Sequence, residues 1–193
     1  DCNNRWVSLD PLRGSIAAVA ESARNVSCVG AQPVAITNNL NFASPETEIG
    51  YWQLSTACEG ISIACEALET PVTGGNVSLY NESIDEEGNK KPIQPTPVIG
   101  MVGVLDNVKQ AVSSGWKNIN DEIWIIGSRD SGLTLGATSY LEYFHGQITG
   151  RPPSLNLIDE KLCQLFIRNG ILNNLIISSH DVSDGGLAIA LAE

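Results

Sequence analysis

The sequence predicts an α+β fold in which a mixed sheet packs against helices. Apolar residues recur at helical spacing in several stretches, and short β-branched stretches lie between them. The order of these stretches is irregular, so neighbouring strands need not be parallel, and this favours α+β over a doubly wound sheet. The 193 residues, 42% of them hydrophobic and 17% charged, are enough for one large or two small domains.

The first part of the chain predicts two helices around a buried strand. A helix is expected over Pro11–Val26, because Asp10 precedes a first-turn proline and apolar residues follow at helical spacing. The short β-branched stretch Gln32–Leu40 predicts a buried strand. A long helix is expected over Pro45–Leu68. Its predicted core stripe consists of Trp52, Leu54, Ala57, Ile61, Ala64 and Cys65.

Two further strands are expected on either side of a polar turn. They are Val72–Tyr80 and Pro95–Leu105, and the prolines of the second belong at its beginning or at a sheet edge. Between them, Asp85–Lys91 combines acidic residues with glycine and asparagine. We interpret this segment as a solvated hairpin tip rather than as an acidic metal loop.

A change in composition near Ser113 predicts a domain boundary, with one domain over 1–114 and the start of another over 115–193. The second region predicts a strand beginning at Asp121–Gly127 and helices around Leu133–Phe144 and over Asp159–Leu172. A short strand, Leu175–Ser178, and a glycine-rich loop then lead into a last helix without a C-cap signal. The abrupt beginning and end of the sequence suggest a piece of a longer polypeptide.

The formal net charge of −11 argues against nucleic acid and anionic membranes as partners. An anionic ligand would instead need Mg²⁺ and backbone N–H groups. The sequence contains no apolar run long enough for a membrane span and no secretory signal, so a cytoplasmic location is expected. Five cysteines without a CxxC pair are interpreted as reduced thiols rather than as a zinc site.

The stretch Thr73–Ser78 interrupts a predicted strand with Gly-Gly-Asn. It has neither the P-loop nor the dinucleotide-binding fingerprint. Two glycines let a ligand approach the main chain, and the Asn76 amide oxygen is a ligand that Mg²⁺ accepts beside phosphate. If strand alternation persists, Asn76 and Ser78 face the same side of the sheet. A glycine bulge in a sheet with a polar outer face is the simpler alternative.

A second polar set lies at the end of the preceding strand, where Asn38, Asn39 and Asn41 follow Thr37. Asparagines at such a point commonly cap the next helix. Ligands of α/β sheets also bind beyond strand ends, so Asn38 or Asn41 is a candidate for a nucleotide contact. We expect the two polar segments to lie on neighbouring strands, because a single helix separates them in the sequence.

The loop His180–Gly186 contains two carboxylates before a Gly-Gly pair. Asp181 and Asp184 are candidates for a metal or phosphate site, although an N-cap role for Asp184 is the simpler interpretation. The two histidines are His145, expected near a helix end, and His180. No serine or cysteine nucleophile is clearly paired with either, so neither is assigned to catalysis.

Seven stretches together closely resemble the PurL family, the synthetase subunits of phosphoribosylformylglycinamidine synthase, within the PurM-like ATP-binding superfamily. These stretches are Asp10–Gly14, Ala17–Val26, Ala35–Phe42, Tyr51–Gln53, Pro71–Glu82, Pro95–Gly103 and His180–Leu187. The resemblance covers essentially the whole chain. It implies a second PurM N-terminal-like domain over 1–114, followed by the truncated start of a PurM C-terminal-like domain over 115–193.

The resemblance implies an ATP-dependent carbon–nitrogen ligase of purine biosynthesis. ATP phosphorylates an amide oxygen of formylglycinamide ribonucleotide, and ammonia then displaces phosphate from this iminophosphate to give the amidine. Phosphate leaves far more readily than oxide, and this is why ATP is consumed. The implied partners are a glutaminase subunit that supplies the ammonia and, in small-type members, a small bridging subunit.

By position, the resemblance implies that Asn38 and Gly75 bind ATP, that Asn76 binds Mg²⁺ and that Ser78 binds the ribonucleotide. Many members carry aspartate where this chain has Asn38. The family's catalytic histidine and most acidic metal ligands lie outside this chain, so no catalytic residue is expected here and the isolated chain should be inactive. The alternatives are a non-catalytic structural half, or another PurM-like enzyme of the selenophosphate synthetase or thiamine monophosphate kinase type.

Overall fold

The structure is a computed structural model that describes residues 1–127 and 134–193. Its helices are α1 (Asn4–Leu9), α2 (Pro11–Cys28), α3 (Glu48–Leu68), η1 (Val108–Gln110), α4 (Ser139–His145), α5 (Leu157–Leu172) and α6 (Gly186–Ala192). Its strands are β1 (Gln32–Asn41), β2 (Val72–Ser78), β3 (Glu82–Ile84), β4 (Lys90–Pro92) and β5 (Thr96–Val104). No described helix is both long enough and apolar enough to cross a membrane.

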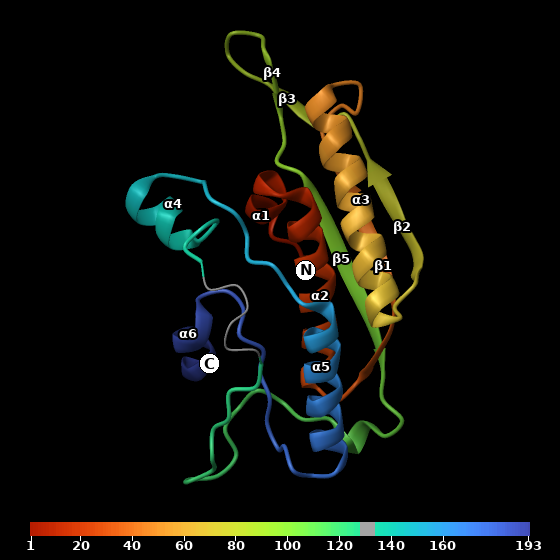
Figure 1. Ribbon diagram of the computed structural model, residues 1–193, viewed down its shortest axis with the longest axis vertical. Helices are drawn as coiled ribbons and strands as arrows, with labels where there is room; N and C mark the ends of the chain where they lie inside the picture. Colours follow the sequence, from red (N-terminus) through yellow and green to blue (C-terminus); the bar gives the residue numbers. More distant parts are fainter. Residues whose placement is uncertain (128–133) are drawn as a thin grey trace.

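A three-stranded mixed sheet and two long helices organise the first half of the chain (Figure 1). Strand β1 is central, with β2 parallel to it on one side and β5 antiparallel on the other. Helices α2 and α3 pack against each other and against one face of this sheet. This mixed arrangement confirms the predicted α+β class.

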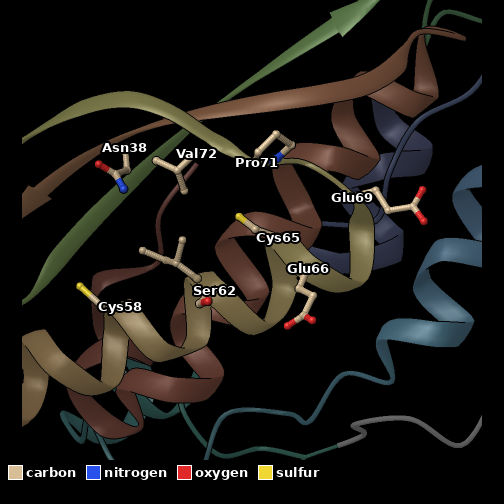
Figure 2. A pocket seen from close by; sticks show the side chains of 9 residues that line it. Asn38, Cys58, Ser62, Cys65, Glu66, Glu69, Pro71 and Val72 are labelled. Carbon is tan, nitrogen blue, oxygen red and sulfur yellow. The ribbon is translucent and has the colours of Figure 1, made fainter.

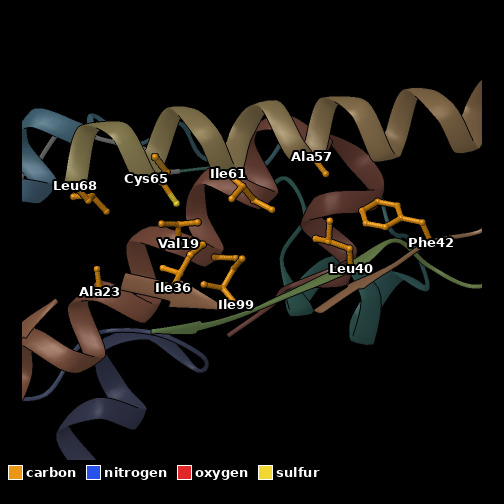
Figure 3. Close-up of a cluster of buried hydrophobic side chains, with 12 residues drawn as sticks. Val19, Ala23, Ile36, Leu40, Phe42, Ala57, Ile61, Cys65, Leu68 and Ile99 are labelled. Atoms are coloured by element: carbon orange, nitrogen blue, oxygen red, sulfur yellow. The ribbon is translucent and has the colours of Figure 1, made fainter. Parts of the chain in front are cut away.

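The hydrophobic core lies between this face of the sheet and the two helices (Figure 3). The sheet contributes Ile36, Leu40 and Ile99, which point towards the helices. The helices contribute Ala18, Val19, Ala23, Ala57, Ile61, Ala64, Cys65 and Leu68. Small residues on both helices allow close approach of their backbones, and Gly60 of α3 lies directly against the Leu12 carbonyl of α2.

The ends of the helices follow from their capping residues. Asp10 accepts a hydrogen bond from the Arg13 N–H at 3.1 Å, which starts α2 with Pro11 in its first turn. Thr47 accepts from the Gly50 N–H at 3.1 Å, so α3 begins at Glu48 and not at the predicted Pro45. The expected boundaries of α2 and α3 are otherwise confirmed to within two residues.

Most of the predicted elements of the first region are confirmed, with one error in the core stripe. Strands β1, β2 and β5 match the predicted stretches, and β3 and β4 form a hairpin whose tip is the predicted polar turn. Trp52, however, is 48% exposed, because it lies on the outer side of α3 away from Ala57 and Ile61. The short helix α1 was not predicted, and Asn3 caps it through the Trp6 N–H.

The second region contains fewer elements than the sequence predicts. The strand expected at Asp121–Gly127 is wrong, because residues 121–127 form no strand and pair with none in the described part of the chain. The strand expected at Leu175–Ser178 is also wrong, since its one pairing is an isolated bridge between Ser113 and Ser178. Helix α5 is confirmed, whereas α4 begins only at Ser139; the predicted start of that helix, Leu133, lies outside the described residues.

Helix α5 connects this second region to the first by packing alongside α2. Arg168 donates to the Ser27 hydroxyl at 2.9 Å, and Arg24 forms an ion pair with Glu160 at 3.0 Å. Helices α4 and α6 lie apart from the sheet, on the left of Figure 1. The extensive packing among described elements therefore involves the sheet, α1, α2, α3 and α5.

Candidate functional site

The two polar segments singled out in the sequence lie side by side on β1 and β2. The strands are parallel, and Asn38 pairs with Gly75, Asn39 with Asn76 and Asn41 with Ser78. This confirms that the segments are neighbours. The pairing shifts by one residue between Ile36 and Thr37, where the β2 partner changes from Val72 to Gly74, so the glycine-containing strand carries the predicted bulge.

Strand alternation divides the four predicted site residues between the two faces of the sheet. Asn38 lies between the buried residues Ile36 and Leu40, so it and its neighbour Gly75 belong to the face covered by the helices. Asn76 and Ser78 belong to the opposite face, together with the exposed Asn39. The geometry therefore forms two pairs rather than one cluster.

Gly75 is required by its neighbour on β1. It has φ +147°, and a Cβ atom at this position would overlap both the backbone oxygen and the side-chain oxygen of Asn38. A Cβ atom added at Gly74, in contrast, would have no neighbouring atom within 4 Å. The open space is therefore at Gly74, while Gly75 allows β2 to approach Asn38 closely.

A groove opens between helix α3 and the first half of β2, with the Asn38 side chain at one end (Figure 2). It has a volume of about 640 Å³, and its lining is mainly apolar. Ile61, Pro71 and Val72 form part of that lining, with Cys58 and Cys65 on the helix side. Burial raises the pKa of the Cys58 thiol. Burial also raises the pKa of the Cys65 thiol, and the nearby Thr70 hydroxyl opposes this to a smaller extent. Both thiols are therefore neutral at physiological pH.

On the opposite face, Asn76 and Ser78 are linked to each other. The Asn76 amide nitrogen donates to the Ser78 hydroxyl at 3.1 Å, which confirms that the two side chains share a face. This hydrogen bond orients the amide, and its oxygen accepts no hydrogen bond from a described residue. A single neutral oxygen fits Mg²⁺ as one ligand among several, with phosphate oxygens and water completing the shell. Asn39, directly opposite, presents a second carboxamide that the sequence interpretation did not assign to ligand binding.

Residues 1–105 match the protein family described as AIR synthase related protein, N-terminal domain. The chain belongs to this family. The AIR synthase related domain comprises α1, α2, α3 and the sheet, and all four predicted site residues lie within it.

Curated relatives and solved structures that are similar to the chain are much longer than it. Over its full 193 residues the chain is 75% identical to phosphoribosylformylglycinamidine synthase subunit PurL of Prochlorococcus marinus (strain MIT 9312), of which it covers 25%. A structure of T. maritima PurL complexed with FGAR is 27% identical over 93% of this chain and 24% of the other, with a TM-score of 0.55. T. maritima PurL complexed with ATP is 38% identical over 55% of this chain and 17% of the other, with a TM-score of 0.48. The chain thus spans about a quarter of the length of these relatives.

The acidic candidates outside the AIR synthase related domain do not form a metal centre in the described residues, where no group of three or more His, Cys, Asp or Glu side chains could hold an ion. Asp181 is mostly buried and lies 3.5 Å from His180 Nδ1. When the Asn25 side-chain amide is rotated so that its oxygen and nitrogen exchange places, its nitrogen donates to both Asp181 carboxylate oxygens, at 3.0 and 3.2 Å. Asp181 therefore attaches the loop to α2.

Two predicted capping roles are wrong. The cap of α3 is Thr47, so the asparagines of β1 do not cap that helix; they remain in the strand as far as Asn41. The cap of α6 is Gly185, without a side-chain hydrogen bond, so Asp184 does not fill this role. His145 lies in the last turn of α4, as predicted. The asparagines are consequently free to line the sheet, which strengthens the interpretation of β1 and β2 as a binding surface.

Proposed function

We propose that the chain supplies part of the ATP, magnesium and substrate site of a phosphoribosylformylglycinamidine synthase. The observation that carries this proposal is the orientation of Asn76, whose amide nitrogen is held by Ser78 and whose oxygen is left to a ligand. The 75% identity to a PurL subunit over the whole chain supports the assignment of the reaction. The likeness to the T. maritima PurL complexed with FGAR supports the assignment of the substrate.

In this proposal ATP lies along the free edge of β2, an outer strand of the described sheet, from which it reaches both faces. Asn38 and the backbone of Gly75 contact ATP, and Asn76 contributes one oxygen to Mg²⁺, which neutralises phosphate charge when bound. Ser78 lies on the same face as Asn76 and orients formylglycinamide ribonucleotide. Because none of these four residues carries an acidic or basic side chain, their role is binding and orientation, which lowers the entropic part of the barrier to phosphoryl transfer.

The proposed reaction transfers the γ-phosphoryl group of ATP to an amide oxygen of the ribonucleotide and releases ADP. Ammonia then forms a new bond to the same carbon while phosphate leaves, giving the amidine. Many family members carry an aspartate at this position, whose carboxylate can make a charge-assisted contact. Asn38 is neutral, so its hydrogen bond to ATP is weaker. We place the reaction in the cytoplasm, with the ammonia supplied by a glutaminase subunit, bridged in small-type enzymes by a further small subunit.

The proposal includes the division of the chain into an N-type domain over 1–114 and the start of a C-type domain over 115–193. The family match over residues 1–105 supports the first part. The acid, base and remaining metal ligands of the reaction are assigned to other parts of a full-length synthetase. The chain alone is therefore expected to form no amidine, and amidine formation by the isolated chain would contradict this assignment.

The test uses a chimera in which this chain replaces the matched segment of the Prochlorococcus marinus MIT 9312 relative. Asn76→Ala should lower kcat at least about tenfold and raise the Mg²⁺ concentration needed for half-maximal rate, because a metal ligand is lost. The matched control is Gln147→Ala, an exposed carboxamide in the second region. Unchanged turnover and unchanged Mg²⁺ dependence in Asn76→Ala would make this segment a structural half rather than part of the site.

A further inference from the structure

A second cavity lies where β1 ends and β5 begins, beside α1. Its volume is about 560 Å³. It is lined by Asn4, Asn41, Asn81, Ile93, Gln94 and Thr96. Four of these six residues are primary carboxamides, contributed by α1, by β1 and by the segments that flank the β3–β4 hairpin.

The lining of this cavity contains no charged side chain among the described residues. It therefore offers no cation to a phosphate group and no carboxylate to a metal ion. Its polar groups are neutral donors and acceptors, and Ile93 adds an apolar wall. Such a lining is complementary to an uncharged ligand group that is rich in hydrogen bonds.

Two of the carboxamides are fixed by hydrogen bonds from their amide nitrogens. Asn41 Nδ2 donates to the backbone oxygens of Asn39 and Thr96, at 3.1 and 3.2 Å. Asn81 Nδ2 donates to the backbone oxygen of Ser78 at 2.8 Å. With both nitrogens engaged, these two side chains offer oxygens, which can accept hydrogen bonds from a ligand N–H or O–H group.

The other two carboxamides are available as donors. In the described part of the chain, the side chains of Asn4 and Gln94 have no hydrogen-bond partner, and both residues are exposed. They can donate to a ligand carbonyl oxygen. The cavity thus combines fixed acceptors with adjustable donors, which matches the paired N–H and C=O groups of an amide.

The cavity adjoins the residue proposed to bind substrate. Ser78 is the β2 neighbour of Asn41, and its backbone oxygen accepts hydrogen bonds from the Phe42 N–H at 3.0 Å and from Asn81. These bonds join the ends of β1 and β2 to the cavity wall. A ligand held by the Ser78 hydroxyl can therefore extend towards the carboxamides.

We propose that this cavity binds the amide-bearing portion of the ribonucleotide, with Asn41, Asn81, Asn4 and Gln94 as specificity-determining residues. The inference rests on the proposed function for the identity of the substrate. The ligand chemistry itself, an uncharged amide, follows from the lining. Ribose hydroxyl groups share part of this chemistry, so the experiment compares the two groups directly.

The first measurement uses the 193-residue chain, uniformly labelled with ¹⁵N, and follows side-chain NH₂ signals. N-Formylglycinamide should shift the signals of Asn41 and Gln94 saturably, whereas ribose 5-phosphate should not. The Gln147 signal serves as the internal control. Absence of any shift with N-formylglycinamide, or equal shifts with ribose 5-phosphate, would overturn the assignment of the amide portion. This measurement does not depend on synthetase activity.

The second measurement uses the chimera and the variants Gln94→Ala and Asn4→Ala, which remove no internal side-chain hydrogen bond of the described structure. Each should raise KM for formylglycinamide ribonucleotide by roughly 2- to 10-fold, the value of one neutral hydrogen bond, and leave KM for ATP unchanged. Unchanged substrate KM in both variants of an active chimera would overturn the inference. An inactive parent chimera would instead count against the proposed function, and the NMR titration would then decide the cavity's ligand.

Discussion

The first 114 residues build a packed hydrophobic core, whereas the rest of the chain leaves most of its apolar side chains exposed. Phe42, Ile36 and Ile99 are at most 1% exposed between the sheet and the helices. Beyond residue 114, Trp124 is 75% exposed and Phe166 is 59% exposed. In the described structure, the buried apolar residues of the second region are Ala137, Pro152 and Ile171.

This difference shows how far a local pattern can determine structure. Residues 121–126 have the composition of a strand, as β1 does, but only β1 has strands on both sides of it. A strand without a partner leaves its backbone groups to water and its side chains unpacked. Among the described helices and strands, α5 makes the most contacts between the second region and the first. Outside α5, Trp6 and Arg13 donate to the backbone oxygens of Ala137 and Pro152. The stability of the second region should therefore depend on a small number of contacts with α1 and α2.

The largest expected difference between the regions is the effect of removing a phenylalanine. Phe42→Ala should lower the free energy of unfolding by about 3–5 kcal/mol, because it leaves a cavity in the core. Phe166→Ala, at an exposed position, should change it by less than about 0.5 kcal/mol. Urea denaturation of the two variants measures both values. Similar losses in the two variants would contradict the contrast between a packed and an unpacked region.

The contact between α5 and α2 should depend on the buried pair of Arg168 and Ser27. Burial lowers the pKa of the Arg168 guanidinium, which stays charged, so losing its acceptor is costly. Ser27→Ala should lower the free energy of unfolding by about 1.5–3 kcal/mol. In this variant the backbone amides of α5 should exchange with deuterium faster than those of β1. Ser55→Ala on the exposed side of α3 is the control. Equal exchange in both variants would show that the pair does not hold α5.

Within the first region, the two glycines of β2 should respond differently to an added methyl group. Gly75→Ala forces a side chain into the atoms of Asn38 at φ +147°, and should cost about 1–3 kcal/mol. Gly74→Ala meets open space and should have a much smaller effect. Thermal unfolding of the two variants compares them directly. An equal loss from Gly74→Ala would mean that the bulge, rather than the contact with Asn38, requires glycine.

The smallest expected effect is a dependence of stability on pH at the junction of the two regions. Burial raises the pKa of Glu21; nearby Arg24 opposes this, and Asp181 and Asp184 add to it. Because the folded state favours the protonated form, this contribution is fully present below the usual Glu pKa, about 4.5, and is lost as pH rises through the raised value. Glu21→Gln should therefore stabilise the chain at pH 7 by a few tenths of a kcal/mol.

The control for this pH effect is Glu87→Gln in the exposed hairpin tip. Between pH 4 and 7, the unfolding free energy of Glu21→Gln minus that of the parent should increase with pH. The same difference for the control should stay constant. If the unfolding free energy of Glu21→Gln also stayed parallel to that of the parent over this pH range, Glu21 would not contribute to the pH dependence of the junction.

The sequence alone predicted the first region well because its signals are local. The proline after Asp10, the β-branched run of β1 and the helical spacing of α3 each specify an element without reference to distant residues. Trp52 was misplaced because a long helix leaves several apolar residues outside its buried stripe. The strand predicted at 121–127 failed because pairing depends on a partner that local composition does not reveal.

The candidate site was only partly predictable. Alternation along β2 correctly placed Asn76 and Ser78 on one face, and the same rule applied to β1 would have identified Asn39 opposite Asn76. The contact between Gly75 and Asn38 depends on the register of the two strands, which the sequence does not specify. The carboxamide cavity joins residues as distant as Asn4 and Gln94, so it became visible only in three dimensions.

The most direct test of the proposed roles of β1 and β2 is a crystal structure of the chimera with Mg²⁺, a non-hydrolysable ATP analogue and formylglycinamide ribonucleotide. We predict that the Asn76 amide oxygen lies about 2.0–2.1 Å from a magnesium ion and that the Ser78 hydroxyl is hydrogen-bonded to the ribonucleotide. A structure in which both ligands are bound elsewhere, and this part of the sheet contacts only protein or solvent, would contradict it.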